Sequence, residues 1–86
     1  MIEIEYIGSI REDLGLDEEQ QELVWTPEIN DVAALIDHLC EGGGQQWSDI
    51  LRQERLLISL NQAMVKPAHP LTDGDKVSFY PPIAGG

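Results

Sequence analysis

The fold of this 86-residue chain is decided near its middle, by residues 30–39, which read NDVAALIDHL. Val32, Leu35, Ile36 and Leu39 follow one another at i, i+3, i+4 and i+7, which predicts a helix with one apolar stripe for packing on a sheet. Asn30 is a good helix N-cap, and the three glycines at 42–44 are expected to end the helix. The segments on either side of this helix decide which sheet it packs on.

Both flanks of the helix show the period-2 alternation of strands. Upstream, Ile2, Ile4 and Tyr6 alternate with glutamates, and a second strand is expected over 22–26. The connection between them, which runs through 11–16 into an acidic loop at 17–19, is short enough to predict a hairpin. Downstream, we expect a short helix over 45–55, strands at 56–60, 63–65 and 76–80, and turns at Asn61-Gln62 and Asp73-Gly74.

The resulting order, β-β-α-(α)-β-β-β, places two hairpins around one main helix. It predicts an α+β fold of the β-grasp (ubiquitin-like) type, a mixed sheet of about five strands wrapped around one main helix. The handedness of crossover connections favours parallel first and last strands in the middle of the sheet. Ile7 and Tyr80 then share the outward face, and Met64 joins them if the hairpin register allows. A docking patch is the favoured interpretation, although scattered surface apolar residues are normal.

Length and charge limit the classes of protein. The chain suits a single domain over 1–86, and it has neither an apolar run of membrane-spanning length nor a signal-peptide pattern. One cysteine is compatible with a reducing cytoplasm. Sixteen acidic residues against five basic ones give a net charge of −11, which argues against nucleic acid and anionic membranes as partners. A basic protein partner fits this charge, although acidity also aids solubility.

The candidate reactive residues do not predict an enzyme that works on its own. We find no nucleophile–base pair, metal-ligand cluster or phosphate-binding glycine loop in the sequence. His38 lies off the apolar stripe and is interpreted as a solvated surface residue. Cys40 is interpreted as a small core residue, because a reactive thiol requires a basic neighbourhood. No metal site and no bound cofactor are therefore expected.

The last residues, YPPIAGG at 80–86, have a composition suited to insertion into another protein. Prolines favour an extended path, and glycines allow close backbone approach. Residues 81–86 are expected to form a flexible tail with a carboxylate on Gly86. An ATP-using partner could convert this carboxylate to an acyl adenylate, and a sulfur nucleophile could then produce a thiocarboxylate. A disordered tail without chemistry is the simpler alternative.

Two segments carry a family resemblance: NQAMV at 61–65 and HPLTDGDKVSFYPPIAGG at 69–86. They resemble the small subunit of molybdopterin synthase, the MoaD family of sulfur carriers. Weaker matches are Arg11-Glu12, the helix from Asn30, and Trp47. The resemblance spans the chain but is specific only from about Asn61 onward.

This resemblance implies a non-catalytic sulfur-donor subunit. An adenylating MoeB-like enzyme would activate Gly86 with ATP, and a sulfurtransferase system would form the thiocarboxylate. The tail would enter a large, MoaE-like subunit, which supplies the catalytic groups. Sulfur would then pass to cyclic pyranopterin monophosphate, forming the dithiolene of molybdopterin. Two small subunits would flank a large-subunit dimer in a heterotetramer.

Carried over by position, Gly86 is the sulfur-bearing residue and Gly85 its slim neighbour. Ile7, Met64 and Tyr80 match partner-contacting apolar positions, and Arg11 matches a position near the interface. The tail residues that would enter the partner are Pro81, Pro82, Ile83 and Ala84.

The chain departs from the family pattern in two places. Members usually have an aromatic residue where Ile7 stands and a small residue such as alanine where Gly8 stands. The segment at 41–46 is longer and richer in glycine than expected. Apart from ending the helix, its glycines have no function that can be predicted from the sequence.

Two alternatives stay open. A sulfur carrier for thiamine thiazole or for an amino acid would share the fold and the glycine tail. A ubiquitin-like interaction module without covalent chemistry would not need a free C-terminus.

Overall fold

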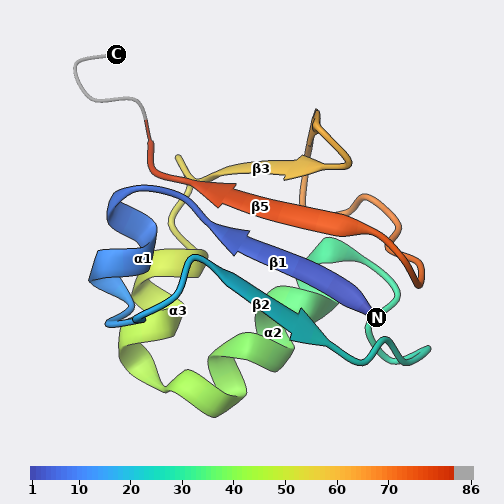
Figure 1. The fold of residues 1–86 in the computed structure, drawn as a ribbon, viewed down its shortest axis with the longest axis horizontal. Coiled ribbons are helices and arrows are strands. Elements are labelled where there is room, and N and C mark those ends of the chain that lie inside the picture. Colours follow the sequence, from blue (N-terminus) through green and yellow to red (C-terminus); the bar gives the residue numbers. More distant parts are fainter. Residues whose placement is uncertain (83–86) are drawn as a thin grey trace.

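The computed structural model describes residues 1–82 and shows a five-stranded sheet with helices on one face (Figure 1). The strands lie in the order β2-β1-β5-β3-β4, with β1 and β5 parallel at the centre and the other neighbours antiparallel. The predicted β-grasp topology is therefore confirmed. Its elements in chain order are β1 (Ile2–Tyr6), α1 (Ser9–Asp13), β2 (Gln20–Leu23), α2 (Val32–Gly43), α3 (Gln45–Leu51), β3 (Leu57–Leu60), β4 (Ala63–Val65) and β5 (Lys76–Tyr80).

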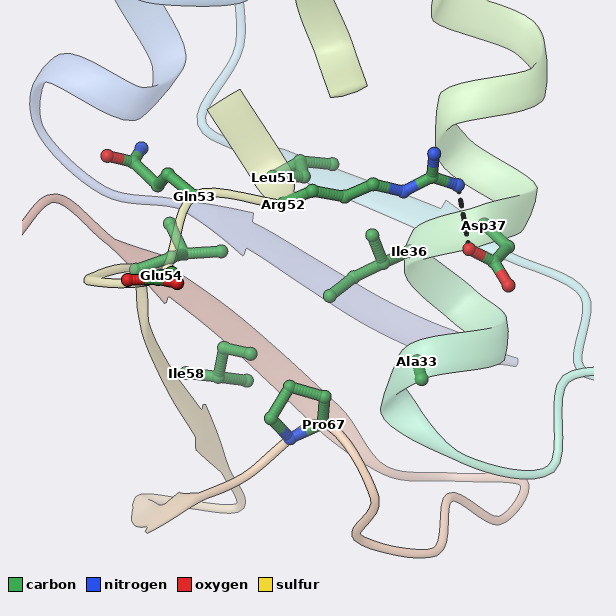
Figure 2. Close-up of a pocket in the computed structure, with 10 residues that line it drawn as sticks. Ala33, Ile36, Asp37, Leu51, Arg52, Gln53, Glu54, Ile58 and Pro67 are labelled. Atoms are coloured by element: carbon green, nitrogen blue, oxygen red, sulfur yellow. Dashed lines mark hydrogen bonds and ion pairs between the residues drawn. The ribbon is translucent and has the colours of Figure 1, made fainter. Parts of the chain in front are cut away.

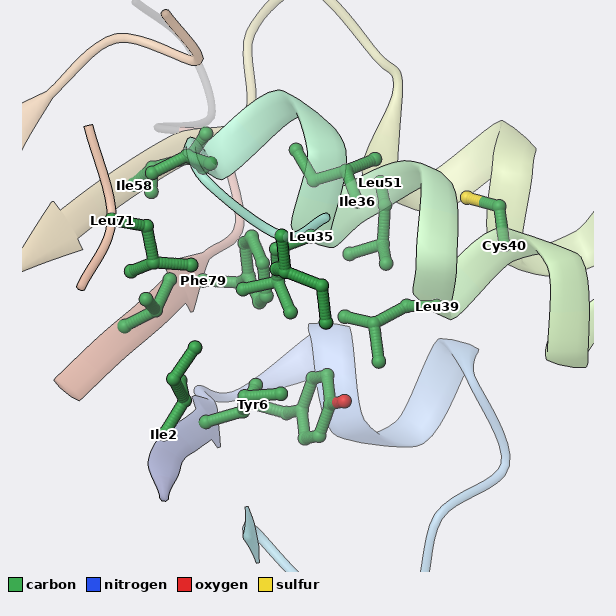
Figure 3. Packing of buried hydrophobic residues seen from close by; sticks show 14 of the residues in the cluster. Ile2, Tyr6, Leu35, Ile36, Leu39, Cys40, Leu51, Ile58, Leu71 and Phe79 are labelled. Carbon is green, nitrogen blue, oxygen red and sulfur yellow. The ribbon is translucent and has the colours of Figure 1, made fainter. Parts of the chain in front are cut away.

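The core lies between the inner face of the sheet and α2 (Figure 3). Leu35 is fully buried there, close to Phe79 of β5 and Tyr6 of β1. The Tyr6 ring stacks on Phe79 with centroids 6.0 Å apart and meets the edge of Trp47 at 5.9 Å. Its hydroxyl donates to Gln21 Oε1 at 2.8 Å, and burial raises the pKa of Tyr6. The apolar faces of β1 and β5 thus pack against the apolar stripe of α2, as predicted.

The start of α2 differs from the sequence prediction by one residue, and its end lies where the glycines were expected to stop it. Asp31, not Asn30, caps the helix, because Asp31 Oδ1 accepts from the Ala34 N–H at 2.7 Å. Asn30 is held outside the helix, where its carbonyl accepts from the Leu71 N–H at 2.9 Å. Gly42 and Gly43 continue the helix, and only Gly44, with φ of 79°, ends it. The helix therefore ends within the three glycines, as expected from the sequence.

The first hairpin also differs from its prediction. Residues 9–13 form α1 instead of a lead into a loop, and the helix buries Ile10. The second strand is β2 at Gln20–Leu23, not 22–26. Trp25 leaves the sheet because its Nε1–H donates to the carbonyls of Ile29, at 3.0 Å, and Leu71, at 3.3 Å. One local contact and one contact that is distant in sequence thus hold Trp25 outside the sheet.

The second half of the chain follows the prediction more closely. α3 ends at Leu51 rather than at residue 55, and β3 begins at Leu57. Asn61 and Gln62 both have positive φ, 50° and 75°, as the predicted tight turn requires. β5 occupies the predicted residues. Cys40 is buried and His38 is exposed, as interpreted from the sequence.

Candidate partner-docking face

The outward face of the sheet, away from α2, gathers apolar side chains at one end. Tyr80 ends β5, and the antiparallel register places Leu57 of β3 directly opposite it. Met64 of β4 lies opposite Ser59, and the Tyr80 hydroxyl reaches Ser59 Oγ at 3.5 Å. Tyr80 and Met64 therefore approach each other across the small Ser59 side chain.

Ile7 joins this end of the sheet from β1. Its N–H donates to the Phe79 carbonyl at 2.9 Å, which continues the parallel pairing and brings Ile7 beside Tyr80. Met64 is 59% exposed, while Ile7, Leu57 and Tyr80 are half-buried. We call Ile7, Leu57, Met64 and Tyr80 the docking face, since an exposed apolar group of this kind is typical of interaction sites.

The root of the tail leaves from the same end. Pro81 and Pro82 follow Tyr80 directly and are half-buried. Gly8 turns the chain after β1 with φ of 56°, and a Cβ added there would lie 3.8 Å from Pro81 Cγ. The turn and the first proline are therefore neighbours. Four tail residues that were predicted from the sequence to be functional lie outside the described residues: Ile83, Ala84, Gly85 and Gly86.

Polar groups occupy the rest of the outward face around Glu5. Glu5 Oε1 accepts from Ser78 Oγ at 3.1 Å, and Glu5 Oε2 accepts from Gln20 Nε2 at 3.4 Å and lies 3.9 Å from Lys76 Nζ. These contacts fix Glu5 among uncharged and basic partners. The apolar half of the face is thus bordered by an ordered polar half.

Arg11 is placed differently from the other predicted contacts. It lies on α1, and its Nη1 donates to the Leu16 carbonyl at 3.3 Å. No described hydrogen bond or ion pair links it to the docking face. Leu57, in contrast, was missed by the sequence analysis. A two-residue turn at Asn61-Gln62 pairs residue 60 with 63 and residue 59 with 64. Leu57 is two residues before Ser59, so this register would have placed it on the same face as Met64.

The described part of the chain has neither a metal-ligand cluster nor an activated thiol. Among residues 1–82, no group of three or more His, Cys, Asp or Glu side chains could hold a metal ion. The lone thiol, Cys40, is not activated, because burial raises its pKa. No helix in this part is both long enough and apolar enough to cross a membrane.

A separate cleft of about 310 Å³ lies between α2 and the start of β3 (Figure 2). Its lining includes Ile36, Leu51 and Ile58, and the Arg52 Nη2 pairs with Asp37 Oδ1 at 2.7 Å along its rim. Arg52 and Asp37 therefore satisfy each other, while Glu54 also lines the cleft without an ion pair among residues 1–82. The arrangement contains no nucleophile beside a base, so it suits packing rather than chemistry.

Comparison with known proteins decides the family. The sequence profile of the ThiS family matches residues 4–86. The chain belongs to this family of sulfur carriers. It is 35% identical to the molybdopterin synthase sulfur carrier subunit of Escherichia coli strain K12, over the full length of both chains. The resemblance found in the sequence to the MoaD family is thus confirmed.

Solved structures agree with this assignment. A complex of subunits 1 and 2 of molybdopterin-converting factor from Helicobacter pylori contains a chain with 28% identity and a TM-score of 0.64, and the match covers 99% of this chain and 97% of that one. The SAMP1 protein of Haloferax volcanii has a TM-score of 0.72 over 99% of this chain and 98% of that one, with 16% identity, and supports the fold alone.

Proposed function

We propose that this chain is the sulfur carrier subunit of a molybdopterin synthase and donates sulfur from a thiocarboxylate on Gly86. The observation that carries the proposal is the end-to-end match, at 35% identity, to the Escherichia coli carrier, with both chains covered completely. The position of the tail supports it, since Pro81 begins immediately after the central strand β5, beside the docking face.

The chemistry requires two partners because the carrier has no catalytic groups of its own in residues 1–82. An adenylating, MoeB-like enzyme binds ATP, and the Gly86 carboxylate attacks the α-phosphorus, releasing pyrophosphate. A persulfide of a sulfurtransferase system then displaces AMP to form an acyl disulfide, and a thiol cleaves its S–S bond, which releases the thiocarboxylate and forms a new disulfide. The carrier binds no cofactor in this scheme, and ATP is consumed by the partner.

The second partner is a large, MoaE-like subunit that holds cyclic pyranopterin monophosphate. Ile7, Leu57, Met64 and Tyr80 dock on it, with Arg11 near the rim of the interface. Pro81, Pro82, Ile83 and Ala84 run into its active site, and Gly85 allows close backbone approach beside Gly86. The Helicobacter pylori complex of subunits 1 and 2 supports a two-subunit assembly of this kind. Two copies of each subunit form a heterotetramer that works in the cytoplasm.

The test is intact-mass analysis of the protein isolated from its native cell, followed by reconstitution. We expect a fraction whose mass differs by replacement of one oxygen with sulfur, localised to Gly86 by fragmentation. That fraction should convert cyclic pyranopterin monophosphate to molybdopterin when the large subunit is added. A thiocarboxylate that is inactive with the large subunit but active in thiazole or amino-acid synthesis would move the carrier to another pathway. Absence of any sulfur-bearing form in cells that are making the cofactor would contradict the proposal.

A further inference from the structure

The other edge of the sheet, formed by β2, is free to accept another strand. Among residues 1–82, β2 pairs only with β1 and ends the sheet on that side (Figure 1). The Tyr6 N–H donates to the Glu19 carbonyl at 2.7 Å, so Tyr6 and Glu19 form a hydrogen-bonded pair. In antiparallel pairs such positions alternate, and the backbone groups of Gln20 and Glu22 therefore point away from β1, toward the free edge.

The two edges of the sheet are protected to different degrees. Natural edges are commonly blocked by proline, lysine or very short strands. β4 has only three residues and is followed by Lys66 and Pro67. β2 has four residues, none of them lysine or proline, and the first proline after it is Pro27, four residues beyond its end. Val24, just beyond β2, is 66% exposed. The β2 edge is therefore the more open of the two for pairing.

Three adjoining hollows run beside this edge, and we call them together the edge groove. The middle hollow, of about 270 Å³, lies between β2 and the end of α2 and is lined by Leu23, Leu39 and Trp47. Gly42 and Gly43 also line it and carry no side chain that would narrow it. The glycine-rich segment of α2 thus helps to keep this hollow open.

The two outer hollows make the ends of the edge groove acidic. One shares Gln21 and Trp47 with the middle hollow and is lined by Asp17 and Glu18. The other shares His38 with the middle hollow and is lined by Glu28 and Glu41. The groove therefore has an apolar centre between two carboxylates at one end and three at the other, where Asp37 also lines the hollow.

Basic side chains of the chain itself do not neutralise these carboxylates. Arg52 pairs with Asp37, and Lys76 pairs with Glu5. Throughout residues 1–82, no ion pair is formed by Asp17, Glu18, Glu28 or Glu41. A second copy of the chain is a poor occupant, because each copy carries a net charge of −11 and like charges would face each other across the new pair.

We propose that the β2 edge and the edge groove bind an extended basic segment of another protein by strand addition. Its backbone would pair with Gln20 and Glu22, an apolar side chain would enter the middle hollow, and lysine or arginine side chains would reach the acidic ends. Main-chain bonds supply affinity in this recognition mode, and the hollows supply specificity. The surface is separate from the docking face, so the proposal stands independently of sulfur transfer.

The test is a titration of the full chain with a capped octapeptide of four Lys-Val repeats, followed by NMR. We expect shifts at β2, Gly42, Gly43 and the Trp47 indole, and slower amide exchange at Gln20 and Glu22, whose N–H groups gain partners. The same peptide N-methylated at alternate residues should lose most of the affinity, because it cannot complete the ladder. A peptide with glutamate in place of lysine should not bind.

Charge variants separate this site from general attraction to an acidic protein. Glu41→Lys should weaken peptide binding roughly threefold or more, whereas Glu54→Lys, with the same change in net charge elsewhere on the surface, should have less effect. Equal weakening by both variants, equal binding of the N-methylated peptide, or unchanged exchange at Gln20 and Glu22 would overturn the proposal. Concentration-dependent shifts of β2 without peptide would show that a second copy occupies the edge instead.

Discussion

Asp75 is the residue whose polar contacts fix the turn before β5. Its Oδ2 accepts from the Thr72 N–H at 2.8 Å and the Thr72 hydroxyl at 3.2 Å, and its Oδ1 accepts from Asn61 Nδ2 at 3.0 Å. Partial burial alone would raise the pKa of this carboxyl, but these hydrogen bonds and the nearby His69 outweigh burial and lower the pKa. The ionised form is therefore favoured by the fold.

A lowered pKa in the folded state makes the contribution of Asp75 to stability depend on pH. That contribution is complete above the ordinary aspartate pKa of about 3.9 and is lost as the pH falls through the lower folded pKa. Asp75→Asn should reduce the free energy of unfolding by about 1 kcal/mol at neutral pH. Urea unfolding over a pH series measures the difference between the two proteins, which should shrink in acid. A difference that stays constant with pH would contradict this role.

Gly43 is the position in the glycine-rich segment where a side chain cannot fit. A Cβ added there would lie far inside the van der Waals contact distance of three Trp47 ring atoms, whereas one at Gly42 would meet nothing within 4 Å. Gly43→Ala should destabilise the protein by about 1–3 kcal/mol through overpacking. Gly42→Ala, on the same helix, should be neutral or stabilising by up to about 1 kcal/mol. Thermal unfolding of the two variants makes the comparison, and equal behaviour would contradict the packing of Trp47 on Gly43.

At the scale of elements, α2 provides the main support for the sheet. Leu35 is fully buried at its centre, so Leu35→Ala should lower the free energy of unfolding by about 2–5 kcal/mol. His38→Ala, on the exposed side of the same helix, should change it by less than about 0.5 kcal/mol. Chemical denaturation of both variants tests the assignment. A mild effect at Leu35 would mean that α2 is not the principal packing element.

Tyr80 and Leu57, which pair between β5 and β3, are expected to contribute more to partner binding than to the stability of the fold. Tyr80→Ala and Leu57→Ala should each reduce affinity for the large subunit about tenfold or more, while the free chain keeps its circular dichroism spectrum. Val24→Ala serves as the control, since Val24 is an exposed apolar residue at the opposite edge. Isothermal titration measures all three. If Tyr80→Ala unfolds the free chain and leaves affinity intact, the docking face is assigned wrongly.

Those helices and strands that show a regular apolar pattern along their length could be predicted from the sequence. The stripe from Val32 to Leu39 spans two turns, and β5 alternates over its whole length, so both were predicted. α1 is a five-residue helix, too short to show a period. The shift of β2 could not be predicted, because Trp25 is drawn out of the sheet by a carbonyl 46 residues away. The alternation of side chains along β1 and β5 was enough to place Ile7 and Tyr80 on the outward face. Placing Leu57 there required the register of the β3–β4 hairpin as well.

At the scale of the whole molecule, the proposed function requires the fold to present a tail of fixed length beside the docking face. In this proposal the docking face sets where the large subunit sits, and the number of residues after Tyr80 determines where the Gly86 carboxylate arrives. A misplacement of about 1 Å of a reacting atom can cost roughly a hundredfold in rate. Sulfur transfer is therefore expected to depend on the position of the Gly86 carboxylate as well as on its chemistry.

The most direct test compares molybdopterin formation by the native chain and by a chain extended with one alanine after Gly86. Both are given to the adenylating enzyme, ATP, the sulfur source and the large subunit, with circular dichroism to show that both are folded. The native chain should give product, and the extended chain should form it about a hundredfold or more slowly. Chemically prepared thiocarboxylate on the native chain should restore synthesis without ATP. Full activity of the extended chain, with no trimming detected by mass, would contradict the sulfur-carrier mechanism.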